Sequence, residues 1–225
     1  MSDTPLLDAI EIDTGANPTA AVIWMHGLGA DGSDFAGVLP QLGLPPELAV
    51  RFVFPHAPHM PITCNNGYVM RAWYDILYFD DIDRHADENG VRQSIAAVAA
   101  MIAQLNRDGI ATKRIVLAGF SQGGAIAYSA GLTYPDKLAG IVALSTYWPS
   151  ASLINNSANN INRGTPVFAA HGLQDPVVPY VLGDRARAQT EALGNPVQWQ
   201  HYPMQHSVCV PELQAIGAFL RKVLA

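Results

Sequence analysis

The pentapeptide at residues 119–123, GFSQG, places one serine between two glycines. An apolar run typical of a β-strand, residues 115–119, precedes the serine, and small residues that suit a helix follow it. On such a strand-to-helix turn, a serine is held in sparsely allowed backbone space, and glycines beside it avoid collisions with neighbouring elements. Ser121 is therefore the candidate nucleophile for acyl transfer.

A serine hydroxyl needs a base to become nucleophilic at neutral pH, and three histidines follow Ser121. In enzymes built on this turn, the acid and then the histidine follow the serine along the chain. His171 ends an expected strand and His201 lies inside another, whereas His206 falls in the loop after the last expected strand. A loop residue can reach back over the nucleophile, so we predict His206 as the general base.

The base requires a carboxylate that orients its ring, and this acid should follow a strand between Ser121 and His206. Asp175 comes just after the apolar run at 167–170. Asp136, at the end of an expected helix, and Asp184, within another, are the alternatives, although each is more typical of a cap or a surface charge. We predict Asp175 as the acid.

Acyl transfer also requires backbone N–H groups aimed at the developing oxyanion. The Gln122 amide comes with the serine turn itself. The segment HGLG, residues 26–29, directly follows the apolar run at 20–25 and matches a loop used for this purpose. The second predicted donor is the Leu28 amide.

Strands and helices are expected in alternation along the chain, which predicts a mostly parallel sheet covered on both faces. Together with the serine turn, this predicts one α/β-hydrolase domain spanning residues 1–225. Strands are predicted at 20–25, 51–54, 115–119, 141–144, 167–170 and 197–202, and most of these segments are continuously apolar. Helices are expected at 33–42, from about 91 to 109, and at 122–134, 180–193 and 211–224. The Asn- and Ser-rich residues 155–162 are expected to form a surface loop.

One segment, residues 56–79, interrupts this alternation with prolines and aromatic residues in no clear period. Segments of this length tend to be lids or binding loops, so we expect a lid-like insertion. Its apolar residues Met70, Trp73 and Leu77 are candidates for binding an acyl chain, although some of the segment's apolar residues should belong to the core. His56 and His59 form a pair without an evident third ligand, and no metal site is predicted.

Composition sets further bounds on the 225-residue chain, which is 49% hydrophobic and only 14% charged, against about 25% in average globular proteins. The low charge favours an apolar substrate groove or a self-association face, so a homodimer is possible. A net charge of -6 without a basic block argues against a nucleic-acid partner. No signal sequence or membrane-spanning run is evident, so a cytoplasmic location is expected. Cys64 and Cys209 are expected to be free thiols.

Several motifs together resemble the phospholipase/carboxylesterase family, which includes the acyl-protein thioesterases. In chain order they are HGLGADGSDF, PHAP, WYD, AGFSQGGA, ALSTY, HGLQDPVVP and YPMQH, and the similarity runs from about Ala20 to the carboxyl terminus. The chain is most similar to bacterial-type members. Its candidate triad, Ser121, Asp175 and His206, falls at the family's triad positions, and its candidate oxyanion donors, Leu28 and Gln122, fall at the family's oxyanion positions.

The resemblance implies hydrolysis of carboxylic esters, often thioesters or lysophospholipids, without a cofactor. Substrates would be small or lipid-like esters, or acylated proteins. A non-catalytic binding protein and a peptidase on the same scaffold are the alternatives. One departure is that Gln205 and Ser207 flank the histidine where the family commonly has glycine and glutamate. Because glycine permits a positive φ, the path of this loop is the open point; Ser207 is a possible helix cap.

Overall fold

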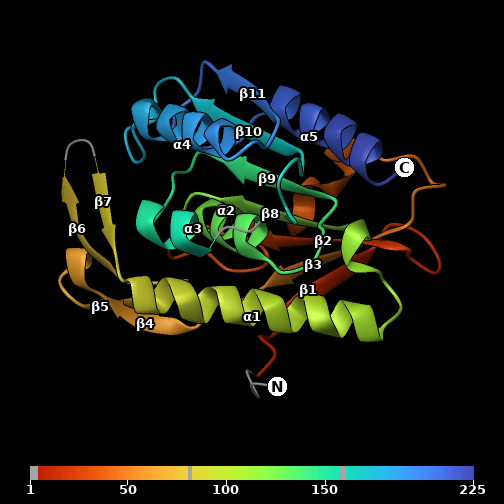
Figure 1. The fold of residues 1–225 in the computed structure, drawn as a ribbon, viewed down its shortest axis with the longest axis horizontal. Helices are drawn as coiled ribbons and strands as arrows, with labels where there is room; N and C mark the ends of the chain where they lie inside the picture. Colours follow the sequence, from red (N-terminus) through yellow and green to blue (C-terminus); the bar gives the residue numbers. More distant parts are fainter. Residues whose placement is uncertain (1–4, 81–82, 158–160) are drawn as a thin grey trace.

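A seven-stranded sheet forms the centre of the molecule (Figure 1), and the computed structural model describes residues 5–80, 83–157 and 161–225. Its spatial order is β1-β3-β2-β8-β9-β10-β11. The strands are β1 (Ala9–Asp13), β2 (Ala20–Met25), β3 (Val50–Pro55), β8 (Ile115–Phe120), β9 (Gly140–Leu144), β10 (Val167–Gly172) and β11 (Val197–Tyr202). Only β1 pairs antiparallel with its neighbour, so the prediction of a mostly parallel sheet is confirmed.

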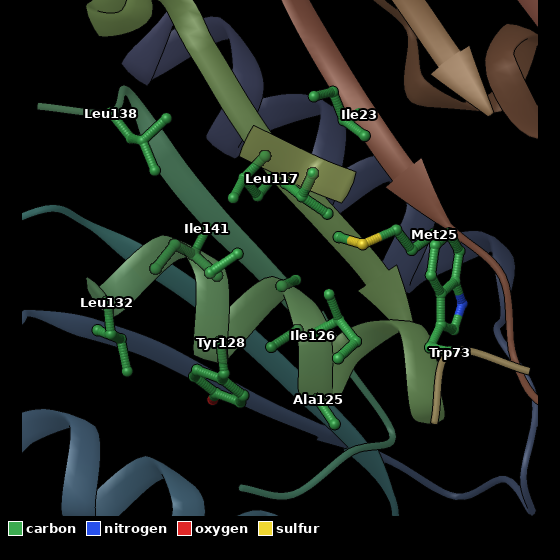
Figure 2. Packing of buried hydrophobic residues seen from close by; sticks show 14 of the residues in the cluster. Ile23, Met25, Trp73, Leu117, Ala125, Ile126, Tyr128, Leu132, Leu138 and Ile141 are labelled. Carbon is green, nitrogen blue, oxygen red and sulfur yellow. The ribbon is translucent and has the colours of Figure 1, made fainter. Parts of the chain in front are cut away.

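Helices cover both faces of this sheet (Figure 1), which explains why its central strands are apolar throughout. Side chains alternate between the faces: in β2, Ile23 and Met25 join one core and Val22 and Trp24 the other. The first core is covered by α1 (Glu88–Arg107), α2 (Gln122–Thr133), α3 (Ala151–Ser157) and α4 (Tyr180–Ala192). The second is covered by α5 (Val210–Val223) and the 3₁₀-helix η1 (Ala36–Leu42). Figure 2 shows α2 packed in the first core.

Two predicted segments differ from the structure. The helix expected at 33–42 is a shorter 3₁₀-helix that contains Pro40, a residue without the N–H that α-helical bonding requires. The loop expected at 155–162 begins as the end of α3, and residues 158–160 lie outside the described residues. Asn162 is buried rather than on the surface, because its side chain accepts from the Leu138 amide and donates to the Tyr134 carbonyl.

The irregular segment expected at 56–79 folds as antiparallel hairpins between β3 and α1. Strands β4 (His59–Ile62) and β5 (Tyr68–Arg71) pair around the short 3₁₀-helix η2 (Thr63–Asn65), and β6 (Ile76–Asp80) pairs with β7 (Asp83–Ala86). The expected boundary at residue 79 therefore falls within a strand. The inner turn at Trp73 and Tyr74 is buried in the first core, whereas Tyr68, Leu77 and Tyr78 are exposed. The insertion thus has a core part and a surface part.

Cys64 and Cys209 are not joined in a disulfide, in agreement with the prediction. Across the described ranges, no helix is long and apolar enough to cross a membrane.

Candidate active site

Ser121 occupies the sharp turn between β8 and α2 with a strained backbone, φ 54° and ψ -120°. A positive φ is unusual for any residue with a side chain and persists only where its surroundings enforce it. Here the Ser121 amide donates to the Leu144 carbonyl at 2.8 Å, and its carbonyl accepts from the Thr146 hydroxyl at 2.6 Å. The turn after β9 therefore holds the serine in place.

The glycines on either side of Ser121 are required by close backbone approaches. A Cβ on Gly119 would lie 2.2 Å from the Gly123 carbonyl oxygen, and one on Gly123 would lie 2.3 Å from the Met25 carbonyl oxygen. These contacts are with backbone, which cannot turn away as a flexible side chain can. The structure thus gives the GFSQG pattern its steric reason.

Asp175 and His206 are brought together by neighbouring parallel strands, because the first follows β10 and the second follows β11. The His206 Nδ1–H donates to Asp175 Oδ2 at 2.7 Å, and Asp175 Oδ1 accepts from the Val177 and Val178 amides at 2.8 Å each. Burial raises the pKa of Asp175, but the hydrogen bonds from His206 and the two amides outweigh it and lower this pKa overall. The acid is therefore ionised, and Nε2 of His206 is left to accept a proton.

The imidazole of His206 lies beside the serine turn. Its ring centroid is 4.7 Å from that of Phe120, the residue before Ser121. Its neighbour Gln205 is not among the residues with positive φ, so the absence of the family's glycine causes no backbone strain. The N-cap of α5 is Cys209 rather than Ser207. The departures from the family pattern around His206 therefore leave it beside Asp175.

The alternative residues lie elsewhere. Asp136 is exposed, and Asp184 forms an ion pair with Arg187 at 2.8 Å. His201 is exposed on the edge strand β11. None of these is joined to His206 by a hydrogen bond within the described parts of the chain.

His171 has a structural role in this turn, as its position at the end of an expected strand favours, and its ring lies against the acid. Its ring is fully buried, with Nε2 2.8 Å from the Val178 carbonyl oxygen and 3.5 Å from Asp175 Oδ2. Burial lowers the pKa of His171, so the ring is neutral and its Nε2–H donates to Val178. A histidine four residues before an aspartate was the available signal, but its partner is a carbonyl that sequence does not reveal.

The amides of Leu28 and Gln122 have no backbone hydrogen-bond acceptor among the described residues, which leaves both free for an oxyanion. The Gln122 side chain, however, is fully engaged. Its Oε1 accepts from the Trp73 amide at 2.9 Å, and its Nε2 donates to the Tyr74 carbonyl at 2.8 Å. The turn after Ser121 is therefore tied to the inner part of the insertion.

The three residues expected to bind an acyl chain have different surroundings. Met70 is half-buried, with its Sδ 3.6 Å from where a Cβ of Gly29 would lie, so it borders the loop that carries Leu28. Leu77 is 43% exposed. Trp73 is only 1% exposed, and the expectation that it contacts substrate is corrected, because core packing encloses its ring.

His56 and His59, the pair considered as metal ligands, have different surroundings. His56 Nδ1 accepts from the Gly32 amide at 3.1 Å, and His59 is exposed on β4. Within residues 5–80, 83–157 and 161–225, no group of three potential ligands of the His, Cys, Asp or Glu types comes together.

The sheet, its helices and the strained serine turn define the chain as an α/β-hydrolase. It belongs to the phospholipase/carboxylesterase family, because that family's model matches residues 8–224. It is accordingly a hydrolase, as the sequence predicted.

Relatives and solved structures agree with this membership. The chain is 38% identical to acyl-protein thioesterase 1 of Mycosarcoma maydis, with 94% of each chain covered. It is 42% identical to acyl-protein thioesterase 1 of Neurospora crassa, covering 93% of this chain and 89% of the relative. The crystal structure of Arabidopsis thaliana SOBER1 matches with a TM-score of 0.85 at 31% identity, covering 92% of this chain and 99% of the other. Zea mays acyl-protein thioesterase 2 matches with a TM-score of 0.82 at 25% identity, covering 97% and 100%.

Proposed function

We propose that this protein is a serine hydrolase that cleaves esters and thioesters of apolar acyl groups through Ser121, His206 and Asp175. The observation that carries the proposal is the 2.7 Å hydrogen bond between His206 and Asp175 on loops beside the strained serine turn. In this mechanism His206 Nε2 takes the Ser121 proton as Oγ attacks the acyl carbonyl. The Leu28 and Gln122 amides stabilise the oxyanion, the alcohol or thiol leaves with the proton, and water then hydrolyses the acyl-enzyme.

Acylated proteins are the substrate class that we favour within this mechanism. Two relatives at 38% and 42% identity are named acyl-protein thioesterases, which supports thioester substrates on proteins. Lysophospholipids are the alternative lipid-like substrates. In this proposal, residues 56–79 act as a lid-like insertion of a single domain, with Met70 and Leu77 contacting the acyl chain. A cytoplasmic location and a homodimer stay predictions from the sequence.

Ser121→Ala tests the nucleophile. The variant should lose turnover of p-nitrophenyl esters and labelling by a fluorophosphonate probe, with an unchanged thermal unfolding midpoint. Ser129→Ala, which alters a buried serine in helix α2 just after the Ser121 turn, is the control for labelling and should react like the wild type. A label on any residue other than Ser121, or a wild type that neither reacts nor turns over, would show that the chain is not this enzyme.

The substrate class needs a separate measurement. Rates with p-nitrophenyl esters of increasing chain length should be compared with rates on an S-palmitoylated peptide and on a lysophospholipid. A preference for the palmitoylated peptide supports the thioesterase role, and a preference for the lysophospholipid replaces it.

A further inference from the structure

Trp73 touches both segments that carry the candidate oxyanion amides. Its indole N–H donates to the His26 carbonyl at 2.9 Å, and its backbone N–H donates to Gln122 Oε1 at 2.9 Å. Its own carbonyl accepts from the hydroxyl of Ser94 in α1. Figure 2 shows the ring beside Met25, where β2 ends and the loop of His26 begins. One buried residue therefore links β2, α1 and α2 at the site.

The direction of the Leu28 N–H is set by the carbonyls of His26 and Gly27, each of which accepts a hydrogen bond. The Gly27 carbonyl accepts from His26 Nδ1 at 2.7 Å, and it shares a peptide with the Leu28 N–H. Because a trans peptide is planar, that N–H must point away from the carbonyl. The preceding carbonyl, of His26 itself, is held by the Trp73 indole. Both peptide planes leading to the first oxyanion donor are thus fixed.

The ring of His26 is itself held in one tautomer. Its Nε2 accepts from the Ala57 amide at 3.1 Å, which leaves the proton on Nδ1 for the Gly27 carbonyl. Burial lowers the pKa of His26, so the neutral ring required for this arrangement is the stable form. The rings of His26 and Trp73 also pack with their centroids 5.3 Å apart.

The second candidate oxyanion donor, the Gln122 amide, lies in a turn that packs against Trp73 and His26. The Gln122 side chain bonds to the Trp73 amide and the Tyr74 carbonyl, much as a neighbouring strand would. The next residue, Gly123, packs so closely that a Cβ there would lie 2.5 Å from the His26 carbonyl oxygen. Trp73 therefore binds both segments, through the His26 carbonyl on one and Gln122 Oε1 on the other, and the distance between the Leu28 and Gln122 amides depends on these two contacts.

We propose that Trp73 is a positioning residue for the oxyanion hole: its two N–H groups hold the Leu28 and Gln122 amides at the separation that the transition state requires. The inference rests on the proposed hydrolase function. It assigns Trp73 no contact with substrate. Removal of its indole N–H should impair the reaction without weakening substrate binding.

Trp73→Phe removes this N–H and keeps an aromatic ring, and the chain offers two matched controls. The indole nitrogens of Trp24 and Trp148 are buried and have no hydrogen-bond partner among the described residues. Trp24→Phe and Trp148→Phe therefore make the same chemical change without breaking a hydrogen bond. All three variants should be assayed for kcat and KM with a p-nitrophenyl ester, and for inhibition by a trifluoromethyl ketone, which forms an oxyanion adduct with serine.

In the Trp73→Phe variant, kcat should fall by about 10- to 100-fold, less than the roughly 10²–10³ lost when an oxyanion donor is removed outright. Its KM should stay within about twofold, while its affinity for the ketone should fall by the same factor as kcat. The controls should stay near wild type in all three measurements. A Trp73→Phe enzyme that matches the controls, or that changes only KM, overturns the inference. A wild type without turnover or fluorophosphonate labelling overturns the proposed function instead.

A second pair of variants decides the question if Trp73→Phe does not fold. The amide nitrogen of Asn can take the place of His Nδ1, whereas the longer Gln side chain reaches only the position of Nε2. His26→Asn should therefore keep the bond to the Gly27 carbonyl and most of kcat, and His26→Gln should lose both. Equal kcat values in these two variants would show that orientation of the loop peptides does not control the reaction.

Discussion

The two halves of the candidate site are held in different ways. Ser121 and the Gln122 amide lie where backbone packs on backbone, with Gly119 and Gly123 allowing contacts that no other residue fits. Asp175 and His206 instead lie on loops, joined by one hydrogen bond across 31 positions of sequence. The nucleophile is thus fixed by close backbone packing, with hydrogen bonds to the turn after β9, whereas the acid and base are joined by a side-chain hydrogen bond between two loops, which a smaller change can disturb.

The largest expected effect is in the loop half. Asp175→Asn replaces the carboxylate with an amide that donates to His206 Nδ1, so the ring takes the tautomer with its proton on Nε2 and cannot accept the Ser121 proton. The rate should fall by about 10⁴-fold, as for the equivalent change in serine proteases, with an unchanged KM. Asp184→Asn is the control, because that carboxylate pairs with Arg187 on the surface of α4, and its kcat should match the wild type. An Asp175→Asn enzyme with near-normal kcat would leave the acid unidentified.

Two glycine substitutions test directly whether the two halves of the site differ in rigidity. A Cβ on Gly123 would lie 2.3 Å from the Met25 carbonyl of a central strand, whereas one on Gly172 would lie 2.4 Å from the Met204 and Gln205 carbonyls of the His206 loop. The strand cannot move without disturbing the sheet, but the loop can. Gly123→Ala should therefore destabilise the fold by about 3 kcal/mol or more, lowering the thermal midpoint by roughly 6–12 °C.

Gly172→Ala should shift the His206 loop and lower kcat by up to about 10²-fold, with a much smaller loss of stability. Gly37→Ala is the control for both variants, because a Cβ there meets no atom within 4 Å. Thermal unfolding and kcat should be measured on all three. If Gly172→Ala instead unfolded as readily as Gly123→Ala, the two halves would be equally rigid and the comparison would fail.

This difference also explains what could be predicted from the sequence. The serine turn could be predicted because its sequence signature lies within five consecutive residues, and the apolar strand β8 before it is continuous. His206 and Asp175 were placed by their order along the chain, by elimination and by the family resemblance. Trp73 was assigned to substrate because its contacts with His26 and Gln122 lie 47 and 49 positions away in sequence.

The sequence predicted buried elements of the fold better than elements at the surface. All six predicted strands are present, and all except the partly exposed edge strand β11 are mainly apolar because the sheet is covered on both faces. The edge strand β1 was missed because its residues are only partly buried or exposed. The hairpins of the insertion were also missed, since their strands are four or five residues long and rely on packing rather than on a repeated pattern.

The free energy of unfolding should depend on pH through Glu212, which lies after the His206 loop. This glutamate is fully buried at the start of α5, where its Oε2 accepts from the Cys209 amide at 3.3 Å, and burial raises its pKa from the ordinary 4.5 to about 8. Between these two values the folded protein keeps a proton that the unfolded chain has released. The stability contributed by the protonated group is therefore complete below pH 4.5 and is lost as the pH rises to 8.

Glu212→Gln replaces this group with a neutral one of the same shape. The variant should gain stability relative to the wild type as the pH rises from 4.5 to 8, by up to about 1.4 kcal/mol per pH unit, and the gap should be constant above that range. Chemical denaturation at several pH values measures it. The exposed Glu47→Gln is the control and should follow the wild type throughout. Parallel curves for Glu212→Gln and wild type would show that the buried carboxyl does not hold its proton.

The smallest expected effect concerns the surface part of the insertion. If Leu77, 43% exposed on β6, lies against the acyl chain, Leu77→Ala should cost about 1 kcal/mol of apolar contact. KM for a long-chain p-nitrophenyl ester would then rise about fivefold, whereas kinetics with the acetyl ester would not change, because a two-carbon group cannot reach the leucine. Leu6→Ala removes a leucine of similar exposure, 48%, that lies beside Val53 and Met101 away from the serine turn, and should leave both substrates unaffected. An equal effect of Leu77→Ala on both esters would mean that β6 acts on the serine turn itself, and the insertion would then belong entirely to the rigid half of the site.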